Sequence, residues 1–234
     1  MNMATQNLLV ELFVEELPPK ALKKLGEAFA SQLAQQLQNL GLASEASVVT
    51  PYASPRRLGA HITQVSDKAA DKEVQQKLMP VSVGLDASGQ ATPALIKKLQ
   101  ALGAKAEALF YDSQVSGATL APGLQQALEM ALSQLPIPKV MSYQLHADCD
   151  MPGWTTVNFV RPAHGLVALH GSSVVTVKAL GLTAGNITHG HRFEAAVDPV
   201  RLADANSYVA TLARDGAVIA SFSERRAEIV RQLA

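Results

Sequence analysis

The sequence is poor in several kinds of residue, and each shortage excludes a class of protein. Aromatic residues make up only 5% of the 234 residues, so leucine, valine and alanine must fill the core. The single cysteine, Cys149, excludes an internal disulfide and a cysteine-based zinc site. No apolar run reaches the roughly 20 residues that a membrane-spanning helix needs, and no signal peptide precedes the first strand. We therefore expect a cytoplasmic protein with no membrane contact.

The chain also lacks an excess of charge of either sign. Its 20 Lys and Arg residues balance 20 Asp and Glu residues, which gives a formal net charge of +0. A free-standing nucleic-acid binder usually has a basic excess, so any RNA contact must be a local patch or shared within a larger assembly. Neither a Walker loop nor a Gly-x-Gly-x-x-Gly loop occurs. Nothing therefore predicts that this chain activates an amino acid with ATP.

Apolar residues make up 48% of the chain, which is enough to build a core. A leucine-rich stripe at three- and four-residue steps predicts a helix that begins after Pro19 and ends near Gly41. The 67–77 segment has no clear period and is predicted as a connecting arm, and turns or loops are predicted at 51–55 and 86–89. Strands are predicted at 8–14, 47–50, 57–65, 110–115, 154–160, 165–170 and 174–180. Further helices are predicted at 93–102, 122–135, 204–212 and from 222 onward.

This order of elements predicts an α+β fold, with a mixed or antiparallel sheet and flanking helices. We assign residues 1–200 to one α+β domain and residues 201–234 to the start of a helical segment. Ser221 and Glu224 have the spacing of a capping box, so the last helix should begin there. No stop signal ends that helix at Ala234, and we expect further chain to follow it.

Two pairs of cationic residues next to prolines are candidate anion contacts. Arg56 and Arg57 follow Pro55, and two guanidinium groups there could hold a phosphate or carboxylate. The alternative is one solvated arginine and one surface ion pair. Arg161 and His164 flank a proline turn and could bind an anion together. In the alternative, Arg161 pairs with an acid and His164 caps a turn.

The densest polar cluster is His189-Gly190-His191-Arg192-Phe193. A His-x-His pair could place two imidazoles on one strand face, as some metal sites require. Because the sequence fixes no third ligand, we predict no metal site. Two roles of this cluster stay open. Arg192 and a histidine could contact an anion or RNA, or the cluster could form a purely structural hydrogen-bonded turn.

The acids Glu11, Glu15 and Glu16 surround the end of the first predicted strand. Paired carboxylates can perform acid–base chemistry, but solvated acids, or partners for arginines of a neighbouring strand, are the expected roles. Ser54 and Ser142 have no plausible base near them in the sequence. The sequence therefore predicts no catalytic residue.

Five motifs occur in one order along the chain. They are Glu-Glu-Leu-Pro-Pro-Lys at 15–20, Pro-Arg-Arg-Leu at 55–58, Leu-Pro-Ile-Pro-Lys-Val-Met at 135–141, Phe-Val-Arg-Pro-Ala-His at 159–164 and Gly-His-Arg-Phe at 190–193. With these motifs the chain resembles the N-terminal portion of the β subunits of bacterial tetrameric glycyl-tRNA synthetases. The resemblance covers nearly the whole chain, but only the N-terminal third of the family's usual length.

The resemblance implies a function for this chain within an α2β2 enzyme. The α subunit would form glycyl-adenylate with ATP and Mg, so this chain would bind no cofactor and would support charging by tRNA binding and subunit assembly. Its fold would resemble the B3/B4 module of phenylalanyl-tRNA synthetase β chains. Two alternatives stay open: a purely structural scaffold, and an editing-like hydrolase of mischarged tRNA that uses His164, His189 or His191 as base.

Overall fold

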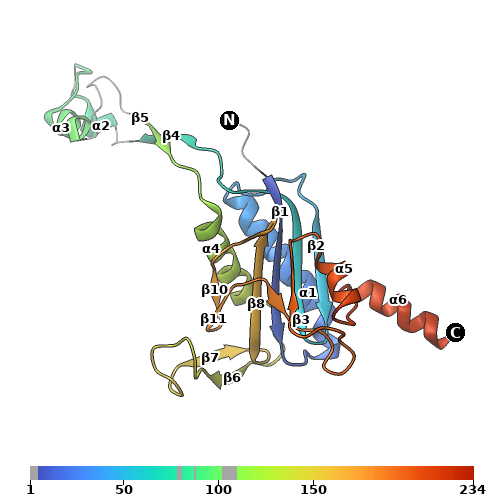
Figure 1. Ribbon diagram of the computed structural model, residues 1–234. Coiled ribbons are helices and arrows are strands. Elements are labelled where there is room, and N and C mark those ends of the chain that lie inside the picture. Colours follow the sequence, from blue (N-terminus) through green and yellow to red (C-terminus); the bar gives the residue numbers. More distant parts are fainter. Residues whose placement is uncertain (1–4, 78–80, 87, 102–109) are drawn as a thin grey trace. The chain divides into compact units, whose positions relative to one another are not determined.

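The computed structural model describes residues 5–77, 81–86, 88–101 and 110–234 (Figure 1). The chain divides into two compact units. Unit 1 comprises Met1–Ala69 and Ala118–Ala234, and unit 2 comprises Ala70–Gly117. Unit 1 contains every candidate site residue named above.

Unit 1 is built on a five-stranded sheet in the order β2-β3-β1-β8-β9, in which all neighbouring strands are antiparallel. The strands are β1 (Thr5–Val14), β2 (Val49–Ser54), β3 (Arg57–Ser66), β8 (Ala163–His170) and β9 (Ser173–Val174). The central strand β1 is covered on both faces, and its side chains alternate between them. Leu8, Val10 and Leu12 belong to one core cluster, and Leu9 belongs to the other.

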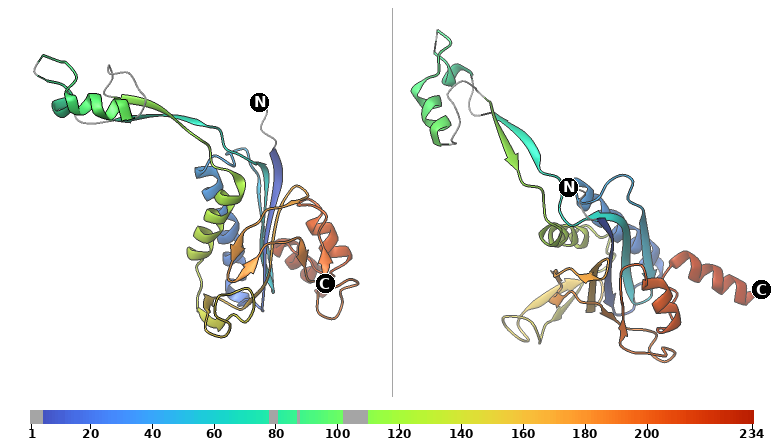
Figure 2. Two further views of the ribbon diagram at one scale, coloured as in Figure 1. Left: turned by 60° about the vertical axis from the view of Figure 1, so that its left-hand side comes forward. Right: turned by 45° about the horizontal axis from the view of Figure 1, so that its top comes forward.

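Two helices cover the first face of the sheet, α1 (Pro19–Asn39) and α4 (Leu120–Ser133) (Figure 2). The predicted stripe of α1 is confirmed: Leu25, Phe29 and Leu33 are fully buried there. Each such side chain contributes about 1.5–3 kcal/mol through burial. Gly41 ends the helix as predicted, with φ +74° and its N–H donating to the Gln38 carbonyl at 2.9 Å.

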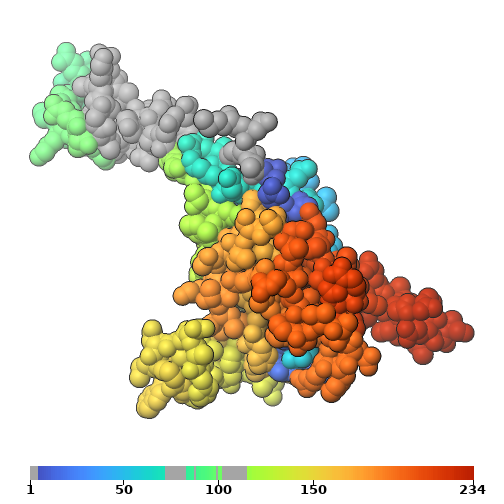
Figure 3. All heavy atoms as spheres, in the orientation of Figure 1, coloured from blue at the N-terminus to red at the C-terminus, as the bar shows by residue number. Residues whose placement is uncertain are grey.

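The opposite face carries α5 (Tyr208–Arg214) and the strand pair β12 (Ile187–Thr188) and β13 (Val200–Arg201). Tyr208 and Leu212 of α5 pack there with Leu9 of the central strand. The last helix, α6 (Phe222–Leu233), contacts the rest of unit 1 through its first turn and then projects away from it, and none of its side chains is fully buried (Figure 3). The predicted start of this helix is confirmed, since the Ser221 hydroxyl accepts from the Glu224 N–H.

Several predicted elements of unit 1 are wrong in detail. The predicted loop at 51–55 is largely strand, because β2 runs to Ser54 and an edge strand tolerates Pro51. The predicted strand at 174–180 is divided between β9 and β10 (Lys178–Ala179), which pairs with β11 (Leu182–Thr183). Helix α4 begins two residues before the predicted Pro122. A hairpin of β6 (Met141–Gln144) and β7 (Thr156–Phe159) includes one strand that was not predicted.

Unit 2 is a two-stranded ribbon with two short helices. The strands are β4 (Lys72–Lys77) and β5 (Phe110–Val115), which pair antiparallel, so the prediction of a connecting arm over 67–77 is wrong. The helices are α2 (Val81–Gly84) and α3 (Pro93–Ala101). The predicted last residue of the second helix, at 102, lies outside the described residues. Asp86 forms the predicted turn by accepting from the Ser88 hydroxyl and from the N–H groups of Gln90 and Ser88, and these bonds lower the pKa of its carboxyl.

The segment of unit 1 that precedes unit 2 and the segment that follows it are hydrogen-bonded to each other. The Ala69 N–H donates to the Ala118 carbonyl at 2.8 Å, and the Leu120 N–H donates to the Asp67 carbonyl at 2.8 Å. Lys68 and Thr119 form an antiparallel bridge beside them. Unit 1 therefore holds the two ends of the 70–117 insertion side by side.

The structure confirms the α+β fold, with an antiparallel sheet and flanking helices. The likeness to the B3/B4 module and the domain boundary after residue 200 stay predictions. Among the helices that the structure describes, none is both long and apolar enough to cross a membrane.

Candidate functional site

A buried carboxylate lies in the middle of the sheet. Glu11 on β1 is 0% exposed, and it faces the α5 side of the sheet. One of its oxygens accepts from the Thr188 hydroxyl and the other accepts from the Tyr208 hydroxyl. The second oxygen also lies 3.3 Å from Nε of Arg57 on the neighbouring strand β3. Glu11 thus neutralises an arginine of a neighbouring strand, which was one of its expected roles, and its burial requires such partners.

Arg57 connects this carboxylate to the loop that follows β12. Its side chain is 3% exposed, Nη1 donates to the Ser54 hydroxyl at 3.3 Å and Nη2 donates to the His189 carbonyl. The Nε–H has no aligned acceptor, although Glu11 is within ion-pair distance, so that contact is electrostatic rather than a hydrogen bond. Because its charge is already paired with Glu11, the role of Arg57 is to hold the loop after β12 in place rather than to bind a ligand.

The buried network predicts an alkaline limit to stability. Burial, and then the charge of Glu11, raise the pKa of Tyr208 well above its ordinary value. Because the folded state favours the neutral phenol, Tyr208 contributes its full stabilisation below the pKa of an unfolded tyrosine, which is about 10. As pH rises above that value, the unfolded state is stabilised by ionisation and the contribution of Tyr208 to stability is lost. We expect Tyr208→Phe to lower stability at pH 7 by about 1.5–3 kcal/mol, the value of a hydrogen bond to a charged group.

The same variant should lose less stability than the wild type between pH 7 and alkaline pH, because one group that resists ionisation is gone. Urea denaturation at a series of pH values measures both effects. Tyr52→Phe is the comparison, since burial raises the pKa of Tyr52 as well but the residue lies outside the Glu11 bonds. Parallel pH profiles for Tyr208→Phe and wild type would contradict the assignment.

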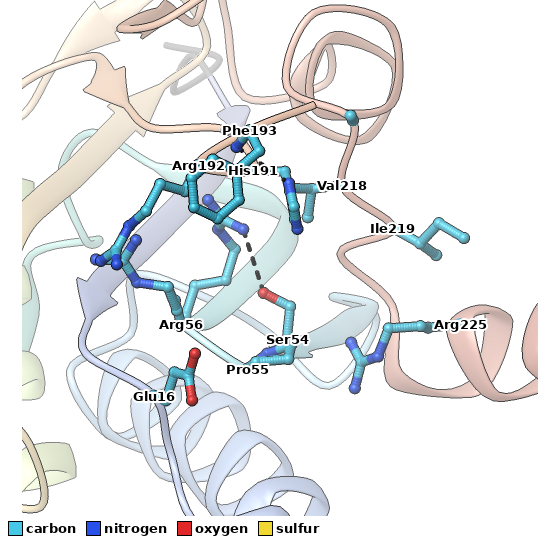
Figure 4. A pocket seen from close by; sticks show the side chains of 13 residues that line it. Glu16, Ser54, Pro55, Arg56, His191, Arg192, Phe193, Val218, Ile219 and Arg225 are labelled. Atoms are coloured by element: carbon cyan, nitrogen blue, oxygen red, sulfur yellow. Dashed lines mark hydrogen bonds between the residues drawn. The ribbon is translucent and has the colours of Figure 1, made fainter. Parts of the chain in front are cut away.

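A cavity of about 350 Å³ opens beside this network (Figure 4). Its walls come from the end of β1, the β2–β3 turn, the loop after β12, the segment before α6 and the first turn of α6. The lining residues are Glu16, Ser54, Pro55, Arg56, Arg57, Gly190, His191, Arg192, Phe193, Ala217, Val218, Ile219 and Arg225. Four of them are arginines and one is an acid, so the cavity is electropositive.

Arg56 and Arg225 are half-buried members of the cavity wall. The Arg56 guanidinium lies 4.7 Å above the Phe13 ring, and its Nη2 is 3.4 Å from the Glu15 carboxylate. Nη1 of Arg225 donates to the Ala53 carbonyl at 2.9 Å, and desolvation lowers the pKa of that arginine. Sequence reasoning missed Arg225, although the capping box placed it in the first turn of α6.

The loop from His191 to Phe193 forms the other wall. The His191 N–H donates to the Gly216 carbonyl at 2.7 Å, and its Nδ1 accepts from the backbone N–H groups of Phe193 and Glu194. A neutral ring that accepts at Nδ1 has its proton on Nε2, which leaves that atom as a donor. His191 thus forms the hydrogen-bonded turn that was one of its two readings. The exposed Arg192 contacts no polar partner within the part of the chain that the structure describes.

Gly190 and Gly216 bring the two walls together by direct backbone contact. A Cβ on Gly190 would lie 2.6 Å from both the Cα and the carbonyl oxygen of Gly216, and 2.6 Å from the Ala195 Cβ. No side chain fits at that distance, so only glycine permits this approach.

The remaining predicted residues do not line the cavity. The Arg161 Nε–H donates to the Glu16 carbonyl at 2.9 Å, and His164 Nε2 lies 3.0 Å from the Glu15 carboxylate. His189 Nδ1 lies 3.0 Å from the Asp198 carboxylate. The structure therefore brings together Arg56, Arg57, His191 and Arg192 but leaves Arg161, His164 and His189 outside. Across the described residues, no three His, Cys, Asp or Glu side chains gather as a metal ion would need.

Comparison with known proteins gives the class of this chain. A family model described as "Glycyl-tRNA synthetase beta subunit" matches residues 8–234. The "Glycine--tRNA ligase beta subunit" of Polaromonas naphthalenivorans is 71% identical to 99% of the chain, over 35% of its own length. Proteins of the same description from Paracidovorax citrulli and Dechloromonas aromatica are 66% and 63% identical, over 35% and 34% of their lengths.

These matches place the chain among aminoacyl-tRNA synthetase subunits. More narrowly, the chain belongs to the glycyl-tRNA synthetase β-subunit family, which confirms the resemblance stated on the five motifs. It spans about a third of the length of the curated relatives that it matches.

Proposed function

We propose that this chain is the N-terminal part of a glycine–tRNA ligase β subunit, and that it supports attachment of glycine to tRNA by binding tRNA and assembling with an α subunit. The adenylate forms at the α subunit, with ATP and Mg, in an α2β2 enzyme of the cytoplasm. The proposed likeness to the B3/B4 module rests on the resemblance alone. The observation that supports tRNA binding is the arginine-lined cavity.

The charges of the cavity suit a polyanion. Guanidinium groups bind phosphate oxygens through paired N–H donors. The charge of Arg57 is paired with Glu11 and that of Arg56 with Glu15. Arg192 and Arg225, in contrast, have no acidic partner among the described residues and face a cavity lined by one acid, Glu16. A chain with no net charge therefore has a local basic patch, which is the form that an RNA contact was expected to take.

The hydrolase alternative has less support from the geometry. A hydrolytic site needs a nucleophile or water activated by a base. Among the hydrogen bonds of the described residues, none joins a histidine to a hydroxyl or thiol, and the Ser54 hydroxyl accepts from Arg57 instead. Release of free amino acid from mischarged tRNA, lost in His191→Ala, would revive this alternative.

Titration of labelled glycine tRNA with the chain at several salt concentrations tests the proposal. We expect binding that weakens linearly on a log–log plot as salt rises, because phosphate contacts release counterions. Arg192→Ala should weaken binding and reduce the salt slope by about 1, whereas Arg226→Ala, an exposed arginine of α6 outside the cavity, should leave both unchanged. Absence of binding at low salt would favour the scaffold alternative.

A further inference from the structure

We infer that the cavity takes one unpaired nucleotide of an RNA, with its base stacked on Phe193 and its phosphate held by Arg56 and Arg192. The inference rests on the proposed function and adds the chemical class of the ligand. It follows from three features of the same cavity: an exposed aromatic ring, an excess of cationic donors and a fixed loop.

The first feature is the exposure of Phe193. Its side chain is 84% exposed, although it lines a cavity whose other apolar members include Val218 and Ile219. Its one ring neighbour among the described residues is His191, at 6.2 Å between centroids and an interplanar angle of 63°. With 84% of the side chain exposed, most of the phenyl ring is open to solvent. Proteins recognise single-stranded RNA by stacking its bases on such rings.

The second feature is the position of the cationic donors. Arg56 and Arg192 both extend toward the same side of Figure 4, and Arg225 enters from α6. The Nε2–H of His191 adds a neutral donor to the same wall. A base inside a duplex has both faces covered by its neighbours, whereas an unpaired nucleotide can stack its base on Phe193 while arginines hold its phosphate.

The third feature is the fixed loop. Arg57 bonds the His189 carbonyl, and Gly190 packs directly against Gly216. The backbone that carries Phe193 and Arg192 is therefore held in place before a ligand binds, which lowers the entropy cost of binding. The cavity of about 350 Å³ lies near the lower end of the range for small-ligand pockets, which suits one nucleotide rather than several.

The test uses a fluorescently labelled single-stranded RNA of about 10 nucleotides, within the length that one single-strand site covers. We expect Phe193→Ala to weaken binding by about 5- to 150-fold, which is the loss of one base–aromatic stack. The matched control is Trp154→Ala, since Trp154 is 79% exposed and lies outside the cavity. Duplex RNA of equal length and a free nucleoside monophosphate complete the titrations.

Selective loss of single-strand binding in Phe193→Ala, with Trp154→Ala and duplex binding unchanged, would support the inference. If glycine tRNA binds but Phe193→Ala has no effect on any ligand, the inference fails and the proposed function stands. If the single strand binds through Phe193 but tRNA does not, the proposed function fails instead. A free nucleoside monophosphate that binds as tightly as the single strand would overturn RNA as the source of the ligand.

Discussion

Replacement of Glu11 by alanine is expected to lower the free energy of unfolding by about 3–5 kcal/mol, the cost of removing one partner of a buried ion pair. The variant leaves the Arg57 guanidinium buried without a counter-charge, and it removes the acceptor for both Thr188 and Tyr208. Urea denaturation followed by circular dichroism measures the loss. Glu27→Ala is the matched control, because Glu27 pairs with Lys23 on the exposed surface of α1 and should change stability by at most about 0.5 kcal/mol.

A double variant separates the charge from the packing. Replacing both Glu11 and Arg57 by methionine removes the whole ion pair and keeps much of the side-chain volume. We expect this variant to be more stable than Glu11→Ala alone, since no buried charge is left unpaired. A double variant that is less stable than the single one would show that the pair contributes mainly through its hydrogen bonds to Ser54, Thr188 and the loop.

Replacement of Gly190 by alanine should destroy the cavity. The added Cβ would lie 2.6 Å from the backbone of Gly216, so one of the two walls must move. We expect a stability loss of about 1–3 kcal/mol, typical of an overpacked site, and loss of most of the binding of glycine tRNA. Gly185→Ala is the matched control, because a Cβ there meets nothing within 4 Å.

Denaturation and tRNA titration of the same samples distinguish the loss of stability from the loss of tRNA binding. A folded Gly190→Ala variant that binds tRNA normally would mean that the loop from His191 to Phe193 takes no part in binding. A variant that loses binding while it keeps most of its stability would locate the RNA contact at this wall. Addition of a stabilising osmolyte shows whether lost binding reflects unfolding.

Local sequence patterns were sufficient for much of the fold. The leucine stripe, the proline at its start and Gly41 at its end define α1 because each acts within a few residues. The capping box of Ser221 and Glu224 defines the start of α6 for the same reason. The prediction at 51–55 failed because the tolerance of a strand for proline depends on whether it lies at the sheet edge, which local sequence does not show.

The site was predictable only in part. The motifs at 55–58 and 190–193 were identified, but their meeting depends on a hydrogen bond between residues 132 positions apart. The burial of Glu11 had a local signal, since apolar residues precede and follow it in β1, which marks a strand covered on both faces. Nothing in the sequence placed Arg161 and His164 away from the cavity, because only the register of β1 with β8 decides that.

The hydrogen bonds between the segments that precede and follow the 70–117 insertion bear on how the length of this protein can change. Because Ala69 bonds Ala118 and Asp67 bonds Leu120, the chain leaves unit 1 and returns to it at neighbouring positions. An insertion anchored in this way acts as a loop whose ends are already closed by its host. Residues can therefore be gained or lost between 70 and 117 with little entropic cost to the sheet of unit 1. This segment is where evolution can vary length while the arginine-lined cavity stays intact.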